Sequence, residues 1–87
     1  MWTLIFEDSA SEVFRKLDKP VQRRIKKYLE GVSKLPDPSA RGKPLTANFA
    51  GYWRYRVGDY RLICRIEQNK LIITVVMLGH RSTLYDA

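Results

Sequence analysis

Apolar residues in the first part of the chain recur with the spacing of one strand followed by two helices. Residues 2–6 form a short apolar run of β-branched and aromatic side chains, which is typical of a strand. A helical stripe over about 9–17 follows, made of Ala10, Val13, Phe14 and Leu17. A second stripe begins after Pro20, which suits the first turn of a helix, and comprises Val21, Ile25, Leu29 and Val32. Because only two or three residues separate the helices, they are predicted to form an antiparallel hairpin.

The second helix also carries four basic residues between its apolar positions: Arg23, Arg24, Lys26 and Lys27. This pattern favours a solvated helix face over a specific RNA contact. Pro36 and Pro38 end the helix, and residues 36–51 are rich in turn formers and predict a loop. A loop of this length is uncommon in a compact domain, so we expect it, with its Arg41 and Lys43, to have a function.

The second part of the chain predicts three consecutive strands, Tyr52–Val57, Tyr60–Glu67 and Lys70–Leu78. The dipeptides Gly58-Asp59 and Gln68-Asn69 fit the tight turns of an antiparallel meander. The element order is therefore β-α-α-β-β-β, which predicts an α+β fold in a single domain over residues 1–87.

The Gly58-Asp59 turn has a consequence for two arginines. A two-residue turn places Val57 opposite Tyr60 and therefore Arg56 opposite Arg61, and directly opposed like charges are destabilising. A phosphate bound between two guanidinium groups would relieve the repulsion, and Arg54 lies on the same face. The alternative is an exposed, solvated sheet face whose charges protect against aggregation.

The last strand ends in Gly79-His80-Arg81, where the glycine favours a bend or bulge. Such a bend is expected to aim His80 or Arg81 towards the face that carries Arg56 and Arg61. Histidine titrates near neutrality, so His80, the one histidine of the chain, is a candidate for proton transfer. The alternative for a lone histidine is a surface or capping role.

Composition narrows the partners and excludes some chemistry. The chain has 16 Lys and Arg against 9 Asp and Glu, and the net charge of +7 favours a polyanion or an acidic protein, although a basic protein with no nucleic-acid role is also compatible. Cys64, the one cysteine, lies in a predicted strand and is expected to be a buried thiol. One His and one Cys do not make a usual zinc site, so we expect no metal. The chain shows no signal peptide and no apolar run long enough to cross a membrane, which favours the cytoplasm.

Four segments resemble one family, the RelE branch of the RelE/ParE superfamily of toxins: Lys43-Pro44-Leu45, the run from Trp53 to Leu62, Gly79-His80-Arg81, and Tyr85. The resemblance covers essentially the whole chain. The ending Gly-His-Arg followed by a tyrosine favours RelE-like RNA cleavers over ParE-like poisons of DNA gyrase.

This resemblance implies a fold, an activity and partners. The fold is an antiparallel twisted sheet packed by an N-terminal helical hairpin, similar to barnase-like microbial RNases. The activity is that of an mRNA interferase, an endoribonuclease that needs no cofactor and cuts mRNA in the ribosomal A site, beside the 16S rRNA, so that translation stops. The partners are mRNA, the ribosome and an acidic cognate antitoxin. Operator DNA is contacted only through the toxin–antitoxin complex, and no membrane is involved.

The resemblance also carries over site residues: Arg54, Arg56, Arg61, Arg81 and Tyr85. We add Arg41 and Lys43 as RNA-binding candidates and His80 as a catalytic one. The basic pair on the strand is lysine in the best-studied branch of the family but arginine here. Arginine stays protonated, so Arg56 is a poor general base, and His80 or Tyr85 is a candidate for that role. Two other functions stay open: a gyrase-targeting toxin of the same fold, and an inactive toxin kept as an operon co-repressor.

Overall fold

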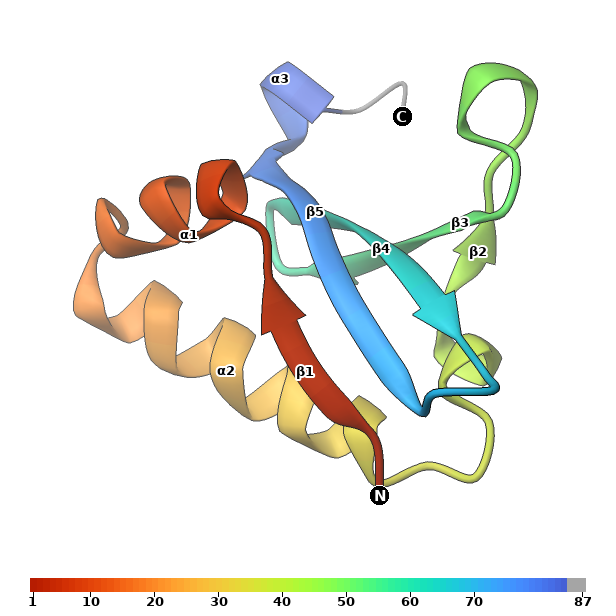
Figure 1. The fold of residues 1–87 in the computed structure, drawn as a ribbon. Coiled ribbons are helices and arrows are strands. Elements are labelled where there is room, and N and C mark those ends of the chain that lie inside the picture. Colours follow the sequence, from red (N-terminus) through yellow and green to blue (C-terminus); the bar gives the residue numbers. More distant parts are fainter. Residues whose placement is uncertain (85–87) are drawn as a thin grey trace.

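The computed structural model describes residues 1–84 and shows the N-terminal helical hairpin packed on one side of a five-stranded sheet (Figure 1). The strands are β1 (Thr3–Phe6), β2 (Lys43–Pro44), β3 (Tyr52–Val57), β4 (Tyr60–Glu67) and β5 (Ile72–His80). The α-helices are α1 (Asp8–Arg15), α2 (Lys19–Ser33) and α3 (Arg81–Leu84). Two 3₁₀ helices, η1 (Pro38–Arg41) and η2 (Ala47–Phe49), lie in the connection between α2 and β3. Within the part of the chain that the structure describes, no helix has the length and apolar character needed to span a bilayer.

The strand order in the sheet is β1-β5-β4-β3-β2, which confirms the α+β class and the β3–β4–β5 meander. The expectation of a wholly antiparallel sheet was wrong at one edge, because β1 runs parallel to β5. A parallel pair requires a long crossover connection, and here everything from α1 to β4 lies between the two strands in sequence. The apolar pattern of residues 2–6 identified a strand, but it did not specify its direction in the sheet.

The segment 36–51, expected to be a loop, contains short regular elements. Its strand β2 pairs with β3, so that Lys43 lies opposite Arg54 and Pro44 opposite Trp53. A two-residue strand that contains a proline has no apolar alternation, and its pairing depends on tertiary contacts. The structure therefore places this segment as the outer edge of the sheet beside the arginine-bearing strand.

The hydrophobic core lies between the sheet and the α1–α2 hairpin. Ile25 and Leu29 of α2 are fully or almost fully buried, and they face Leu62 of β4 and Val75 of β5 across this layer. Cys64 is part of the same core, and burial raises the pKa of its thiol to about 12. The thiol is therefore protonated at neutral pH, which agrees with the inert, buried cysteine expected from the sequence.

Tyr55 attaches the β3 edge to the preceding segment. Its side chain is completely buried, and its hydroxyl donates a hydrogen bond of 2.7 Å to the carbonyl oxygen of Pro38 in η1. Its ring also packs against Gly42, where an added Cβ atom would lie only 3.2 Å from two ring carbons. These contacts fix the position of Arg41 and Lys43 next to the strand that carries Arg54.

Replacing Tyr55 with phenylalanine should lower the free energy of unfolding by about 1–3 kcal/mol, because the buried Pro38 carbonyl loses its partner. The ring stays, so the core packing is preserved. Urea unfolding followed by circular dichroism measures the change, and Tyr60→Phe, at a partly buried tyrosine without a described hydroxyl hydrogen bond, is the control. Equal midpoints for the two variants would contradict the anchoring role of Tyr55.

Candidate functional site

The β3–β4 hairpin brings two arginines face to face, as the sequence predicts. Arg56 pairs directly with Arg61, and Val57 pairs with Tyr60 on either side of the two-residue turn. Gly58 makes the turn possible, because its φ of +59° lies in the left-handed region that favours glycine. Arg54 lies two residues before Arg56 and therefore on the same face of β3.

Arg81 reaches the same hairpin from the end of β5. It begins α3, and its backbone N–H donates a 2.7 Å hydrogen bond to the carbonyl oxygen of Asp59 in the turn. Its Nε atom lies 3.8 Å from Oδ1 of the exposed Asp59 carboxylate, a loose surface ion pair. The backbone contact, rather than the ion pair, therefore places Arg81 beside the turn.

The electrostatics show that these arginines act on one another. Partial desolvation lowers the pKa of Arg61, and the positive charges of Arg56, Arg54 and Arg81 lower it further, whereas Asp59 opposes them. Within residues 1–84, neither Arg54, Arg56 nor Arg61 forms an ion pair with a carboxylate. We call Arg54, Arg56, Arg61 and Arg81 the arginine cluster. The charge of its three strand residues, which have no carboxylate partner among the described residues, favours an anionic ligand.

Arg54 is held in the cluster by packing. Its Nε atom is buried and, among the described residues, has no hydrogen-bond partner. A buried unpaired donor costs about 1–3 kcal/mol, so the sequence tolerates a local penalty at this position. The surrounding side chains thus hold this guanidinium at the β2–β3 edge without a protein acceptor for Nε.

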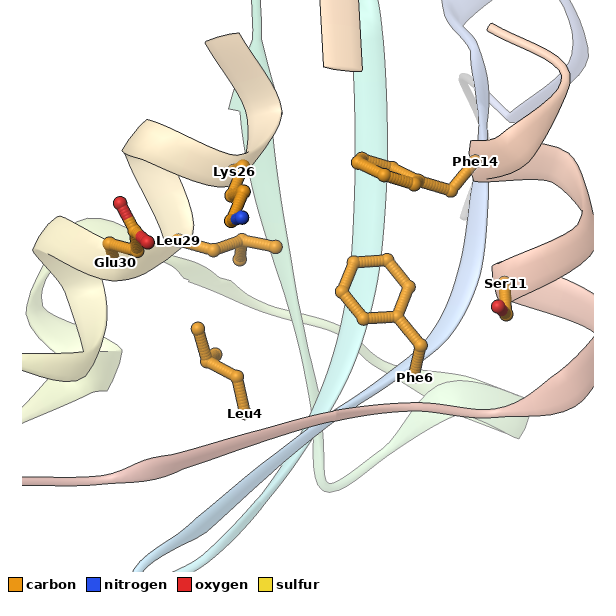
Figure 2. Close-up of a pocket in the computed structure, with 7 residues that line it drawn as sticks. All are labelled: Leu4, Phe6, Ser11, Phe14, Lys26, Leu29 and Glu30. Atoms are coloured by element: carbon orange, nitrogen blue, oxygen red, sulfur yellow. The ribbon is translucent and has the colours of Figure 1, made fainter. Parts of the chain in front are cut away.

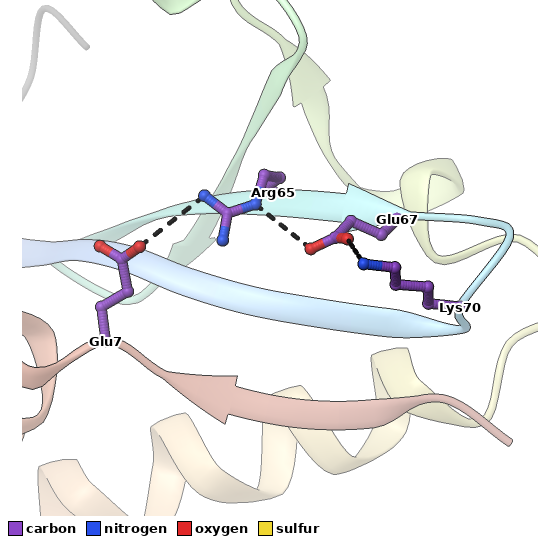
Figure 3. Close-up of polar contacts among 4 residues, drawn as sticks. All are labelled: Glu7, Arg65, Glu67 and Lys70. Carbon is purple, nitrogen blue, oxygen red and sulfur yellow. Dashed lines mark hydrogen bonds and ion pairs between the residues drawn. The ribbon is translucent and has the colours of Figure 1, made fainter.

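Arg65 marks the end of the cluster along β4. It lies on the same face as Arg61 but has carboxylate partners, Glu67 at 3.4 Å and Glu7 at 3.7 Å, as Figure 3 shows. Tyr52 first, and then Glu67, raise the pKa of Arg65, the opposite of the shift at Arg61. Lys70 also contacts Glu67, at 3.6 Å. The paired Arg65 is therefore part of a surface ion-pair network, whereas Arg61 is left for a ligand.

The bend at the end of β5 brings Arg81, and not His80, to the arginines. Gly79 lies opposite Arg61, so the next residue, His80, lies opposite Tyr60 and on the other face of the sheet. The two rings make an edge contact with centroids 5.5 Å apart, and Nδ1 of His80 accepts a 3.1 Å hydrogen bond from the Ser82 backbone. The sequence left open whether the bend aims His80 or Arg81 at the face of Arg56, and the strand pairing favours Arg81. Tyr85 lies outside the described residues.

Two adjoining hollows lie at the β3 edge, beside the arginine cluster. The smaller has a volume of about 190 Å³, and its lining includes the predicted RNA-binding residues: Arg41, Lys43, Arg54 and Arg56. The larger, of about 530 Å³, lies between α2 and the β3–β4 turn and is lined by Arg24, Lys27, Tyr28, Gly31, Arg41, Arg56, Val57 and Gly58. We call the larger one the basic groove. Arg61 and Arg81 line neither hollow. They contribute positive charge next to the hollows, because Arg61 interacts electrostatically with Arg56, which lines both, and with Arg81.

Sequence reasoning missed Arg24 and Lys27, which it placed on a solvated helix face. Their spacing with Tyr28 and Gly31 puts all four on one side of α2, and this i, i+3, i+4, i+7 pattern was the available signal. The pattern alone does not show that β3 and η1 supply the opposite wall.

Replacing Gly58 with alanine should destabilise the domain by about 1–2 kcal/mol, because a residue with a Cβ atom pays that cost in the left-handed conformation. The added Cβ would also lie 2.7 Å from Nη2 of Arg24, so that side chain must move. Thermal unfolding measures the loss. Gly51→Ala is the control. Its φ is also positive, at +90°, but apart from its chain neighbours no described residue has an atom within 4 Å of an added Cβ. Both variants should therefore lose stability, and only Gly58→Ala should displace Arg24.

A third hollow has a different character. It has a volume of about 340 Å³ and lies between β1 and the helical hairpin, where Figure 2 shows the side chains of Leu4, Phe6, Phe14 and Leu29 around it. The Phe6 and Phe14 rings pack with centroids 5.3 Å apart. This apolar pocket suits a hydrophobic side chain rather than an anion.

The arginine cluster can bind a phosphodiester and stabilise negative charge on it. Guanidinium groups are planar, permanently charged and matched to phosphate oxygens. Within residues 1–84, no group of three His, Cys, Asp or Glu side chains is placed to hold a metal ion.

Comparisons with known proteins identify a family and similar folds. Residues 4–85 match the family described as the ParE toxin of the type II toxin–antitoxin system parDE. The chain is 28% identical over 84 residues to toxin RelG of Mycobacterium tuberculosis, covering 97% of this chain and 95% of that protein. It matches a chain of the M. tuberculosis toxin–antitoxin complex RelBE2 with a TM-score of 0.82 and 27% identity, over 93% of this chain and 92% of that one. The fold is also similar to the isolated E. coli RelE toxin, with a TM-score of 0.77 and 23% identity over 92% and 84% of the two chains.

Proposed function

The chain belongs to the RelE/ParE superfamily of type II toxins, and from that premise we propose that it is an endoribonuclease that cuts mRNA. The observation that carries the proposal is the arginine cluster, in which the charges of Arg54, Arg56 and Arg81 act on Arg61. Among the described residues, the three cluster arginines that lie on strands have no carboxylate partner. A substrate phosphate supplies the negative charge that this surface lacks.

The reaction uses a nucleophile from the RNA itself. The 2′-oxygen attacks the adjacent phosphorus in line, loses its proton, and forms a new P–O bond. The bond from phosphorus to the 5′-oxygen of the next nucleotide breaks, and this oxygen takes up a proton. The products are a 2′,3′-cyclic phosphate and a 5′-hydroxyl, so atoms and charge balance without a cofactor.

The arginines supply electrostatic stabilisation in this scheme. Arg61 and Arg81 bind the phosphoryl oxygens, on which negative charge grows in the transition state. Arg54 and Arg56 hold the RNA backbone on β3. Arg56 stays protonated and does not act as the base, so the proton of the 2′-hydroxyl passes to Tyr85 or to a group of the ribosome or substrate. The geometry gives His80 no step, because it lies on the other face of β5.

The ribosome is the proposed site of cleavage. The Gly79-His80-Arg81 ending and the run Trp53 to Leu62 resemble RelE toxins, which supports mRNA cutting in the A site beside the 16S rRNA. The chain would then act in the cytoplasm and inhibit translation.

An acidic antitoxin is the proposed protein partner. Two similar structures, RelBE2 of M. tuberculosis and RelBE of E. coli, are complexes of a toxin with its antitoxin. A net charge of +7 on this chain favours a partner of opposite charge. The complex, rather than the free toxin, would bind operator DNA.

Primer extension on a transcript from induced cells tests the function. We expect new 5′ ends inside the coding region soon after induction, and growth arrest that co-expression of the neighbouring antitoxin gene reverses. Arrest with DNA-damage signalling and intact mRNA would favour a gyrase-directed toxin of the same fold. Normal growth and intact mRNA on induction would favour an inactive co-repressor.

A further inference from the structure

We propose that the basic groove binds a second stretch of RNA backbone, continuous with the stretch on the arginine cluster, and that Arg24 and Lys27 of α2 are its phosphate-binding residues. This inference rests on the proposed function and extends it beyond the residues of the sheet. It assigns a binding role to a helix face that the sequence pattern alone assigned to solvent.

The groove concentrates positive charge from three elements. Arg24 and Lys27 come from α2, Arg41 from the end of η1, and Arg56 from β3. None of its lining residues is acidic, and within residues 1–84 none of these four cations forms an ion pair. Four like charges around a hollow of about 530 Å³ repel one another unless an anion lies between them. The groove is therefore built for a polyanion.

A glycine makes room for one of the guanidinium groups. An added Cβ on Gly58 would lie 2.7 Å from Nη2 of Arg24, and one on Gly31 would lie 3.4 Å from Nη1 of Arg41. The absence of a side chain at Gly58 lets the Arg24 guanidinium lie close to the backbone at the wall of the groove, whereas the distance at Gly31 is an ordinary van der Waals contact. Flat, supported guanidiniums of this kind lose less side-chain entropy when they bind a phosphate.

The path of the groove favours RNA over an acidic protein. Arg56 lines the groove and also lies opposite Arg61 in the hairpin. A single RNA backbone could therefore run from the arginine cluster into the groove and stay in contact with positively charged side chains. A protein segment needs apolar anchors, and in the groove Val57 is buried and Tyr28 is partly buried. The apolar pocket beside β1 offers such anchors on another part of the surface (Figure 2). A phosphate chain needs only the cations.

The test compares two double variants of the same helix. Arg24→Gln with Lys27→Gln removes the groove charges, and Arg23→Gln with Lys26→Gln removes an Arg and a Lys at the same spacing on exposed positions outside the groove. The probe is a fluorescent single-stranded 2′-O-methyl oligoribonucleotide, which the proposed chemistry cannot cut because its 2′-oxygen is blocked. Fluorescence anisotropy over a series of salt concentrations gives the affinity and its salt dependence.

The groove variant should lower the slope of log affinity against log salt by about 1.4, because each phosphate contact to single-stranded nucleic acid contributes about 0.7. Near 0.1 M salt this corresponds to a roughly 25-fold weaker affinity. The control variant should keep most of the wild-type slope. A dinucleotide probe, too short to leave the arginine cluster, should bind the groove variant and the wild type equally.

Three results would overturn the inference: no binding of the oligonucleotide by the wild type, equal losses for the two double variants, or an equal loss with a poly-glutamate peptide, which would indicate an acidic protein segment as the occupant. These readouts involve no cleavage, so they are independent of primer extension in cells. A groove that binds RNA in a protein that leaves mRNA intact would refute the proposed function alone.

Discussion

The Arg81→Ala variant is expected to lose cleavage activity by about 10²–10³-fold, the effect of removing one group that stabilises developing charge in a transition state. The fold should survive, because the backbone N–H of Arg81, which alanine keeps, makes the 2.7 Å contact to Asp59. The side chain contributes a single loose ion pair at 3.8 Å on an exposed surface. Such a pair is worth about 0–1 kcal/mol, so stability changes little while activity collapses.

Single-turnover cleavage on programmed ribosomes, with the cut sites mapped by primer extension, measures the activity. Circular dichroism and the thermal midpoint establish that the variant is folded. Arg23→Ala is the matched control, since it removes an exposed arginine on α2 outside the basic groove and should stay within about twofold of wild type. A folded Arg81→Ala protein that cuts at the wild-type rate would remove Arg81 from the mechanism.

The core of the candidate site could be predicted from local sequence. A two-residue turn at Gly58-Asp59 determines the strand register, and the register determines that Arg56 meets Arg61. Strand alternation then places Arg54 with them. The turn type and the strand alternation depend only on residues that are close in sequence, so they determine these positions whatever the rest of the fold is.

Features that depend on distant segments could not be predicted in this way. The parallel direction of β1 depends on where the chain re-enters the sheet, and the β2 strand exists only through its pairing with β3. The choice between His80 and Arg81 stayed open in the sequence, because the pairing of β5 with β4 determines the face of each residue and places Gly79 opposite Arg61. The basic groove also depends on distant segments, because the Arg24 guanidinium lies against Gly58, which is 34 positions later in the chain.

The Arg61→Gln variant should combine a loss of activity with a gain in stability. Desolvation and then the charges of Arg56, Arg54 and Arg81 lower the pKa of Arg61, so its charged form is less favourable in the folded protein than in the unfolded chain. Arginine is protonated in both states at every pH below this lowered pKa, so the destabilisation persists across the neutral range. Removing the charge should therefore raise the thermal midpoint, while cleavage falls by about 10²–10³-fold.

Salt and phosphate titrations identify the cause of that gain. Added sodium chloride should shrink the difference in thermal midpoint between variant and wild type, because it screens repulsion among exposed charges. Inorganic phosphate should stabilise the wild type more than the variant, because an anion that binds only the folded state shifts the midpoint upward by mass action. Arg65→Gln provides the opposite control: Arg65 has carboxylate partners at 3.4 and 3.7 Å, so its loss should lower the midpoint and leave the phosphate response intact. If Arg61→Gln instead lowered the midpoint at low salt, Arg61 would be a structural arginine like Arg65, and the arginine cluster would lose its central member.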